Sequence, residues 1–78
     1  LTTIRAAIAH FTRTLTAAGV PDAAGDVRRL LAETLGLSPG VLLASPERML
    51  TGAEHERVSS NMLRRVKREP VSRILGAR

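Results

Sequence analysis

The segment DAAGDVRRLLAETLG, at residues 22–36, carries its apolar side chains three and four positions apart. This spacing puts them on one side of a helix, which turns about 100° per residue. The stripe consists of Val27, Leu30, Leu31 and Leu35. Asp22 precedes it, where a negative charge meets the positive end of the helix dipole, and Gly36 follows, where a left-handed residue suits a helix end. We therefore predict a helix that ends at Gly36 and packs its apolar side into a core.

The preceding segment repeats the pattern. Apolar residues recur at helical spacing, namely Ile4, Ile8, Phe11, Leu15 and Ala18. Thr2 or Thr3 can cap the start of such a helix, and Gly19 can end it. We predict a helix over residues 3–18, separated from the next one by the breaker Val20-Pro21-Asp22.

After Gly36 the chain predicts a short helix and then a loop. Ser38 suits the cap position and Pro39 the first helical position, and the apolar residues 41–43 supply one or two turns. Ser45-Pro46 interrupts them, so residues 45–50 are expected to form a loop or a single turn.

A long third helix and a short last one complete the chain. Thr51 and Glu54 stand at capping-box spacing, and the helix they open is expected to run to about Arg68. Its apolar side is expected to hold Val58, Met62, Val66 and, at the margin, Leu63, with His55 beside them as a boundary residue. Glu69-Pro70 then ends this helix and opens the last one, which Gly76 terminates.

These elements predict an all-α fold. Connections of about three to eight residues are normal for neighbouring antiparallel helices. We expect a small antiparallel helical bundle with three main helices plus two short ones, forming a single domain over residues 1–78. The composition, 44% hydrophobic with Phe11 as the single aromatic residue, suits a thin aliphatic core. Because the first residue is Leu1 rather than Met, we expect a domain cut from a longer protein.

Several functional classes are disfavoured by what the sequence lacks. Without cysteine there is no disulfide framework or thiolate metal site, which leaves the compartment open and mildly favours a reducing one. The location that we expect is cytoplasmic. The longest apolar run, residues 41–44, is far shorter than the roughly 20 residues of a membrane span. No nucleophile motif, metal-ligand spacing or glycine-rich phosphate loop is present, so we expect this chain to hold no catalytic, cofactor or metal residue.

The positive charge is concentrated in the last third of the chain. Of the 12 Lys and Arg residues, seven lie in residues 57–78 beside a single acid, Glu69. Arg57, Asn61, Arg64 and Arg68 are spaced to share one outward stripe of the third main helix, flanked by Arg65. Such a surface indicates an acidic or phosphate-bearing partner, and the alternative is a solvated helix face.

Nucleic acid is the obvious alternative partner for this charge, because cations neutralise phosphates. The single phenylalanine offers no stacking platform for single strands. Residues 38–50 also separate the second main helix from the basic one, unlike the short turn of a helix-turn-helix motif. We therefore expect no nucleic-acid partner, and keep a standalone basic nucleic-acid-binding module as the alternative function.

Two segments resemble a known family. Residues 26–36, DVRRLLAETLG, resemble the D-A-R-x-L-L-x-x-x-L-G segment of the HemK-type release factor glutamine methyltransferases. Leu50-Thr51, the basic helix end RRVKR and then EPVSRILG at residues 69–76 are similar to that family's L-T…R-R…E-P-V-A-Y-I-L-G. Ala77-Arg78 stands where members continue toward R-E-F and the catalytic domain. Arg73 departs from the family, which usually has Tyr or His there.

The resemblance implies the small N-terminal domain of such an enzyme. These proteins use S-adenosylmethionine to methylate a glutamine amide of peptide chain release factors, and this chain has neither their glycine-rich cofactor loop nor their N-P-P-Y motif. The implied partners are the release factor and the protein's own C-terminal methyltransferase domain. The candidate partner-binding residues are Arg57, Arg64, Arg65, Arg68 and Arg73. A purely structural appendage that stabilises the catalytic domain is a further alternative.

Overall fold

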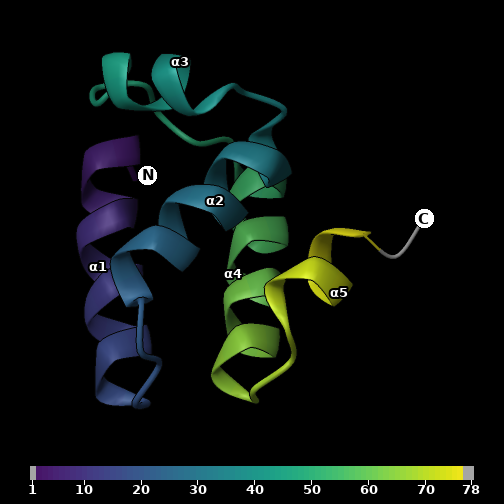
Figure 1. Ribbon diagram of the computed structural model, residues 1–78. Helices are drawn as coiled ribbons and strands as arrows, with labels where there is room; N and C mark the ends of the chain where they lie inside the picture. Colours follow the sequence, from purple (N-terminus) through teal and green to yellow (C-terminus); the bar gives the residue numbers. More distant parts are fainter. Residues whose placement is uncertain (1, 77–78) are drawn as a thin grey trace.

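The computed structural model describes residues 2–76, which form five helices around one core. The helices are α1 (Ile4–Ala17), α2 (Ala23–Leu35), α3 (Pro39–Ala44), α4 (Gly52–Val66) and α5 (Val71–Gly76). Figure 1 shows α1 and α4 running in one direction and α2 running the opposite way across both, with α3 over one end and α5 beside α4. Helix α1 packs on α2 and α4, α3 packs on α2, and α5 packs on α2 and α4. The predicted all-α bundle of three main and two short helices is confirmed.

Side-chain caps explain where the helices begin. The Thr3 hydroxyl accepts a hydrogen bond from the Ala6 amide, and the Ser38 hydroxyl accepts one from Val41. In the predicted capping box, Thr51 accepts from the Glu54 amide at 3.1 Å while the Glu54 carboxylate accepts from the Thr51 amide at 2.9 Å. Each cap satisfies a donor that the first helical turn leaves unpaired, which fixes these starts from local sequence alone.

The three main helices share one kind of C-terminus. In each, one residue beyond the helix takes a left-handed conformation, and its amide and the next amide donate back to carbonyls near the helix end. Glycine fills that position after α1 and α2, at Gly19 and Gly36. After α4 it is filled by Arg68, with φ 70°. The expectation that this helix runs to about Arg68 is therefore slightly too long, because it ends at Val66 and Arg68 lies in the reversal.

The core is wholly apolar in the described residues. Its buried members are Ile4, Ala7, Phe11, Leu15, Val20, Ala23, Val27, Leu30, Leu31, Ala32, Leu42, Leu50, Val58, Met62 and Ile74. Most of these come from the predicted stripes. Of the apolar residues of α3, however, only Leu42 is buried, whereas Val41 and Leu43 face solvent, as Leu63 of α4 does. A six-residue helix that packs on one neighbour covers a single side, so its other apolar residues stay exposed.

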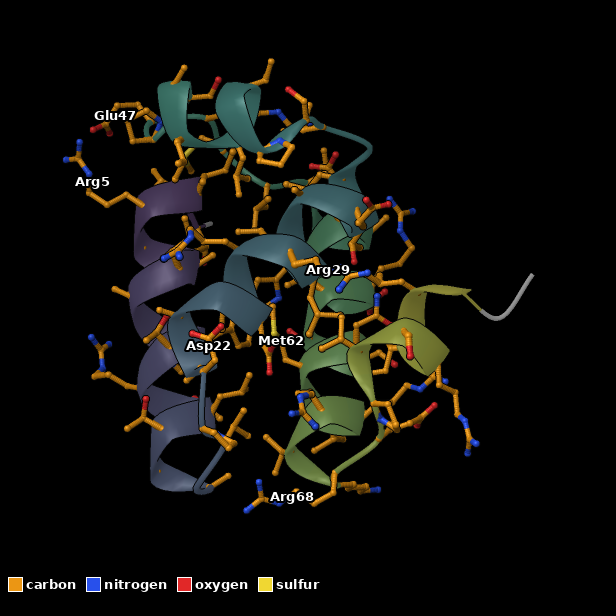
Figure 2. The ribbon with its side chains drawn as sticks, in the orientation of Figure 1. Arg5, Asp22, Arg29, Glu47, Met62 and Arg68 are labelled. Carbon is orange, nitrogen blue, oxygen red and sulfur yellow. The ribbon has the colours of Figure 1, made fainter. Side chains whose placement is uncertain are left out.

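The connection between α3 and α4 closes the N-terminal end of α1. The carbonyl oxygens of Arg48 and Pro46 accept from the amides of Ile4 and Arg5 at 2.9 and 3.0 Å. These amides have no partner within their own helix, so the loop satisfies them in place of water. Figure 2 shows Arg5 and Glu47 approaching each other at this end, where their side chains form a 3.0 Å ion pair. The predicted loop is thus an ordered cap on α1.

Candidate functional site

The five arginines that the sequence singled out lie on α4, the turn after it and α5. Arg57, Arg68 and Arg73 are exposed, whereas Arg64 and Arg65 are half-buried. Arg78, which adds to the basic count of the sequence, and the Ala77-Arg78 match to the family lie outside the described residues. The described arginines fall into two groups, those that bind other groups of the domain and those whose guanidinium groups stay unpaired in residues 2–76.

Arg64 is held by the turn between α4 and α5. Its Nε donates to Oε1 of Glu69 at 2.9 Å, and its Nη2 donates to Oε2, a two-point ion pair. The hydrogen bond from Arg64 is the main cause that lowers the pKa of Glu69 from its ordinary value, and the same bond raises the pKa of Arg64. This pair fastens the residue before Pro70 to the end of α4, and so fixes where α5 begins.

Arg65 joins α4 to α2. Its Nε donates to Oδ2 of Asp26 at 2.9 Å, and its Nη1 donates to the carbonyl oxygen of Glu69 at 3.2 Å. Both charged side chains are more than four-fifths covered, at 18% exposed for Arg65 and 19% for Asp26. The pair therefore links α4 to α2 through two residues that are 39 positions apart in sequence. Beside it, Asn61 Nδ2 donates to Thr34 Oγ1 at 2.8 Å.

Arg68 binds the end of α1. Its Nη2 donates to the carbonyl oxygen of Ala18 at 2.7 Å, and its Nη1 donates to that of Gly19 at 3.2 Å. A cation at a helix C-terminus also meets the negative end of the helix dipole. Figure 2 shows Arg68 at the end of the molecule where α1 and α4 both finish. A side chain at Gly19 would meet this guanidinium, because an added Cβ would lie 3.0 Å from Nη2.

The expected outward stripe is thus only partly correct. Asn61, Arg64 and Arg68 have partners within the domain, because α4 is flanked by α1, α2 and α5 rather than by one neighbour. Arg57 and Arg73 are exposed and form no ion pair with any described residue. The partner-binding role of all five arginines stays a prediction, and these two are the ones with free guanidinium groups.

Sequence reasoning missed a hollow between α2 and α3. It has a volume of about 290 Å³ and is lined mainly by apolar atoms. Its lining includes Arg28, Arg29, Ala32, Glu33, Leu42 and Leu43. The available signal was the run of apolar residues 41–43 in a helix too short to bury them all.

The two histidines lie near Phe11 without forming a ligand site. The ring of His10 meets that of Phe11 edge-on, with centroids 5.0 Å apart, and the centroid of His55 lies 6.3 Å from that of Phe11. The prediction that His55 is a boundary residue is only partly met, because its ring lies near Phe11 but the residue is exposed. No group of three or more potential metal-ligating side chains comes together in residues 2–76. Nor is any helix of that part of the chain long and apolar enough to cross a bilayer.

Comparison with known proteins gives the class of this bundle. Residues 6–76 match the family model of the PrmC N-terminal domain. The chain is 45% identical over 64 residues to a release factor glutamine methyltransferase of Rhodospirillum rubrum, which covers 82% of this chain and 20% of that protein. It is 38% identical over 76 residues to one of Agrobacterium fabrum, covering 97% of this chain and 26% of that protein. No solved structure matches the chain significantly.

The chain therefore belongs to the PrmC N-terminal domain family, because the family model covers nearly all of it. The predicted resemblance to the N-terminal domain of release factor glutamine methyltransferases is confirmed. The chain spans about a fifth to a quarter of the length of the relatives that it matches.

Proposed function

We propose that this domain docks a peptide chain release factor for a methyltransferase domain of the same protein. The relatives it matches are named release factor glutamine methyltransferases, and the domain itself is positively charged and carries no catalytic sequence motif that we recognise. The observation that carries the proposal is that Arg57 and Arg73 remain exposed and unpaired within residues 2–76, whereas their neighbours are used by the fold. Free guanidinium groups suit an acidic protein partner.

The release factor would then contact the enzyme twice, once at the active site and once at this domain. The contact at this domain raises the rate of methyl transfer by tethering the substrate. When the domain holds one part of the release factor, the glutamine to be modified meets the active site as a partly intramolecular event. The domain then needs only modest affinity of its own. Exposed arginines supply such affinity mainly by speeding encounter, and their contribution weakens as salt screens them.

S-adenosylmethionine, the methyl donor implied for the parent enzyme, does not fit the residues of this chain. Residues 2–76 form no strand followed by a glycine-rich loop, and the α2–α3 hollow is bordered by Arg28 and Arg29, which disfavour a sulfonium cation. We assign methyl-donor binding and the transfer step to the methyltransferase domain of the complete protein. We expect that protein to be cytoplasmic. This chain contributes binding and orientation of the protein substrate.

Arg64, Arg65 and Arg68 act in this proposal as positioning residues. Their ion pairs and hydrogen bonds fix the α4–α5 turn and the packing of α4 on α1 and α2. That geometry sets where Arg57 and Arg73 stand relative to each other. Substituting the three is expected to weaken docking through the fold, whereas substituting Arg57 and Arg73 weakens it directly.

A titration of the isotope-labelled domain with purified release factor tests the proposal. We expect amide shifts around Arg57 and Arg73 and several-fold weaker binding for the variant Arg57→Glu/Arg73→Glu, since an exposed ion pair contributes about 0.2–1 kcal/mol. The matched control is Arg13→Glu on α1, which is equally exposed and unpaired in the described part of the chain. Absence of shifts at high concentration contradicts docking, and binding of DNA or RNA in place of release factor supports the nucleic-acid alternative.

A further inference from the structure

The hollow between α2 and α3 has an apolar floor and a charged rim. Ala32 and Leu42 are buried beneath it, and Leu43 borders it while 60% exposed. With a volume of about 290 Å³ it lies at the lower end of the range for ligand sites, too small for a bulky cofactor and suited to anchoring apolar side chains of a larger partner. A hollow with an apolar floor and a few polar groups at its rim is the usual form of a binding site.

The rim is basic because its arginines lack partners. Arg28 and Arg29 are exposed and form no ion pair within the described residues, and Glu33 is the one acid that lines the hollow. Other arginines of the domain do have acidic partners, as Arg5 has Glu47, Arg48 has Glu54 and Arg65 has Asp26. Arg29, labelled on α2 in Figure 2, also borders α5, where it lines a second hollow with Ser72 and Leu75.

We propose that this hollow docks an amphipathic segment of a protein partner that carries carboxylates next to a bulky apolar side chain. The apolar side chain enters the hollow against Leu42 and Leu43, and the carboxylates bind Arg28 and Arg29. Charge complementarity selects this occupant. A second copy of the chain brings a net charge of +5 against the same arginines, and nucleic acid has no aliphatic side chain to insert against Leu42 and Leu43.

The site differs from the release-factor surface proposed above, although Arg29 borders both α3 and α5. It is built on α2 and α3, whereas Arg57 and Arg73 belong to α4 and α5. The domain thus has two contact points, one purely electrostatic and one with an apolar anchor. An apolar anchor slows dissociation, which unpaired surface charges alone do little to change.

A synthetic peptide tests the proposal directly. The peptide carries leucines at helical spacing along one side of a helix, with glutamates beside them. Its binding to the isotope-labelled chain is followed by amide shifts. We expect shifts at Ala32, Leu42 and Leu43. A matched peptide with lysine in place of glutamate, and another with alanine in place of leucine, are each expected to bind about tenfold more weakly or not at all.

Variants locate the binding and separate it from the other surface. Leu43→Ser and Arg28→Glu/Arg29→Glu are each expected to weaken binding of the acidic peptide by about tenfold. The controls are Leu63→Ser, whose leucine is 55% exposed on α4, and Arg13→Glu on α1, and both are expected to keep wild-type affinity. Equal loss in Leu43→Ser and Leu63→Ser, shifts confined to α4 and α5, or no binding by the folded wild-type chain overturns the proposal.

Discussion

Replacing Arg68 separates its two structural roles, because its backbone and its side chain act in opposite directions. The backbone lies at φ 70°, a conformation that costs a non-glycine residue roughly 1–2 kcal/mol. The guanidinium compensates by donating to the carbonyl oxygens of Ala18 and Gly19. Arg68→Ala keeps the backbone cost and loses the hydrogen bonds, whereas Arg68→Gly loses the bonds and also removes the cost.

The free energies of the two effects are of similar size. The exposed hydrogen bonds and the cation at the α1 C-terminus together contribute about 1 kcal/mol after screening by solvent. Arg68→Ala is therefore expected to lower the free energy of unfolding by about 1 kcal/mol, which lowers the melting temperature of a domain this size by about 4–8 °C. In Arg68→Gly the two effects nearly cancel, so its melting temperature is expected to stay close to that of the wild type.

Thermal unfolding followed by circular dichroism measures the difference. Lys67→Ala is the control, because Lys67 is the exposed neighbour at the end of α4 with ordinary backbone angles, and it is expected to change stability by less than about 0.5 kcal/mol. If the glycine variant is destabilised as much as the alanine variant, the left-handed backbone carries no cost and the reasoning is refuted. If Arg68→Gly keeps full stability but loses release-factor binding, Arg68 itself contacts the partner.

Three further perturbations follow from the same structure. Leu31→Ala removes a fully buried side chain from the centre of the core and is expected to lower the free energy of unfolding by about 2–5 kcal/mol in urea titrations, whereas Leu63→Ala, at an exposed position, should change it little. Asp26→Asn leaves the half-buried Arg65 without its anion, so it is expected to destabilise the domain. The control Asp22→Asn replaces an exposed helix cap by another good cap and is expected to cost less. Equal effects of the two variants would contradict a link between α2 and α4. Hydrogen bonds from Arg48 and Arg64 hold the pKa values of Glu54 and Glu69 below the ordinary 4.5, so the unfolded chain takes up protons first as the pH falls. The two ion pairs therefore stabilise the folded domain fully above about pH 4.5 and progressively less below it. A urea midpoint that is equally acid-sensitive in Glu54→Gln/Glu69→Gln would contradict this.

The helices were predictable because their signals are local. Capping hydroxyls at Thr3, Ser38 and Thr51 each act within three residues, and glycine at the end of α1 and α2 marks a left-handed reversal. The end of α4 was less clear because arginine is no such marker. There the reversal depends on the carbonyls of α1 accepting from Arg68, across 50 positions of sequence.

The use of the arginines was not predictable because it depends on how helices pack. Helical spacing alone describes one helix with one covered side, so it placed Arg64 on a solvent-facing stripe with Arg65 at its flank. In the fold, α2 supplies Asp26 for Arg65, and the turn before α5 returns Glu69 to Arg64. The α2–α3 hollow likewise exists only once α3 lies on α2.

The most direct test of the docking role uses the complete protein from which this domain derives. Steady-state methylation of release factor by the Arg57→Glu/Arg73→Glu variant is compared with the wild type and with Arg13→Glu. We predict a raised KM for the release factor, with kcat and the KM for the methyl donor unchanged, because these arginines hold the protein substrate and take no part in transfer. An unchanged KM for the release factor in a folded variant would contradict the account.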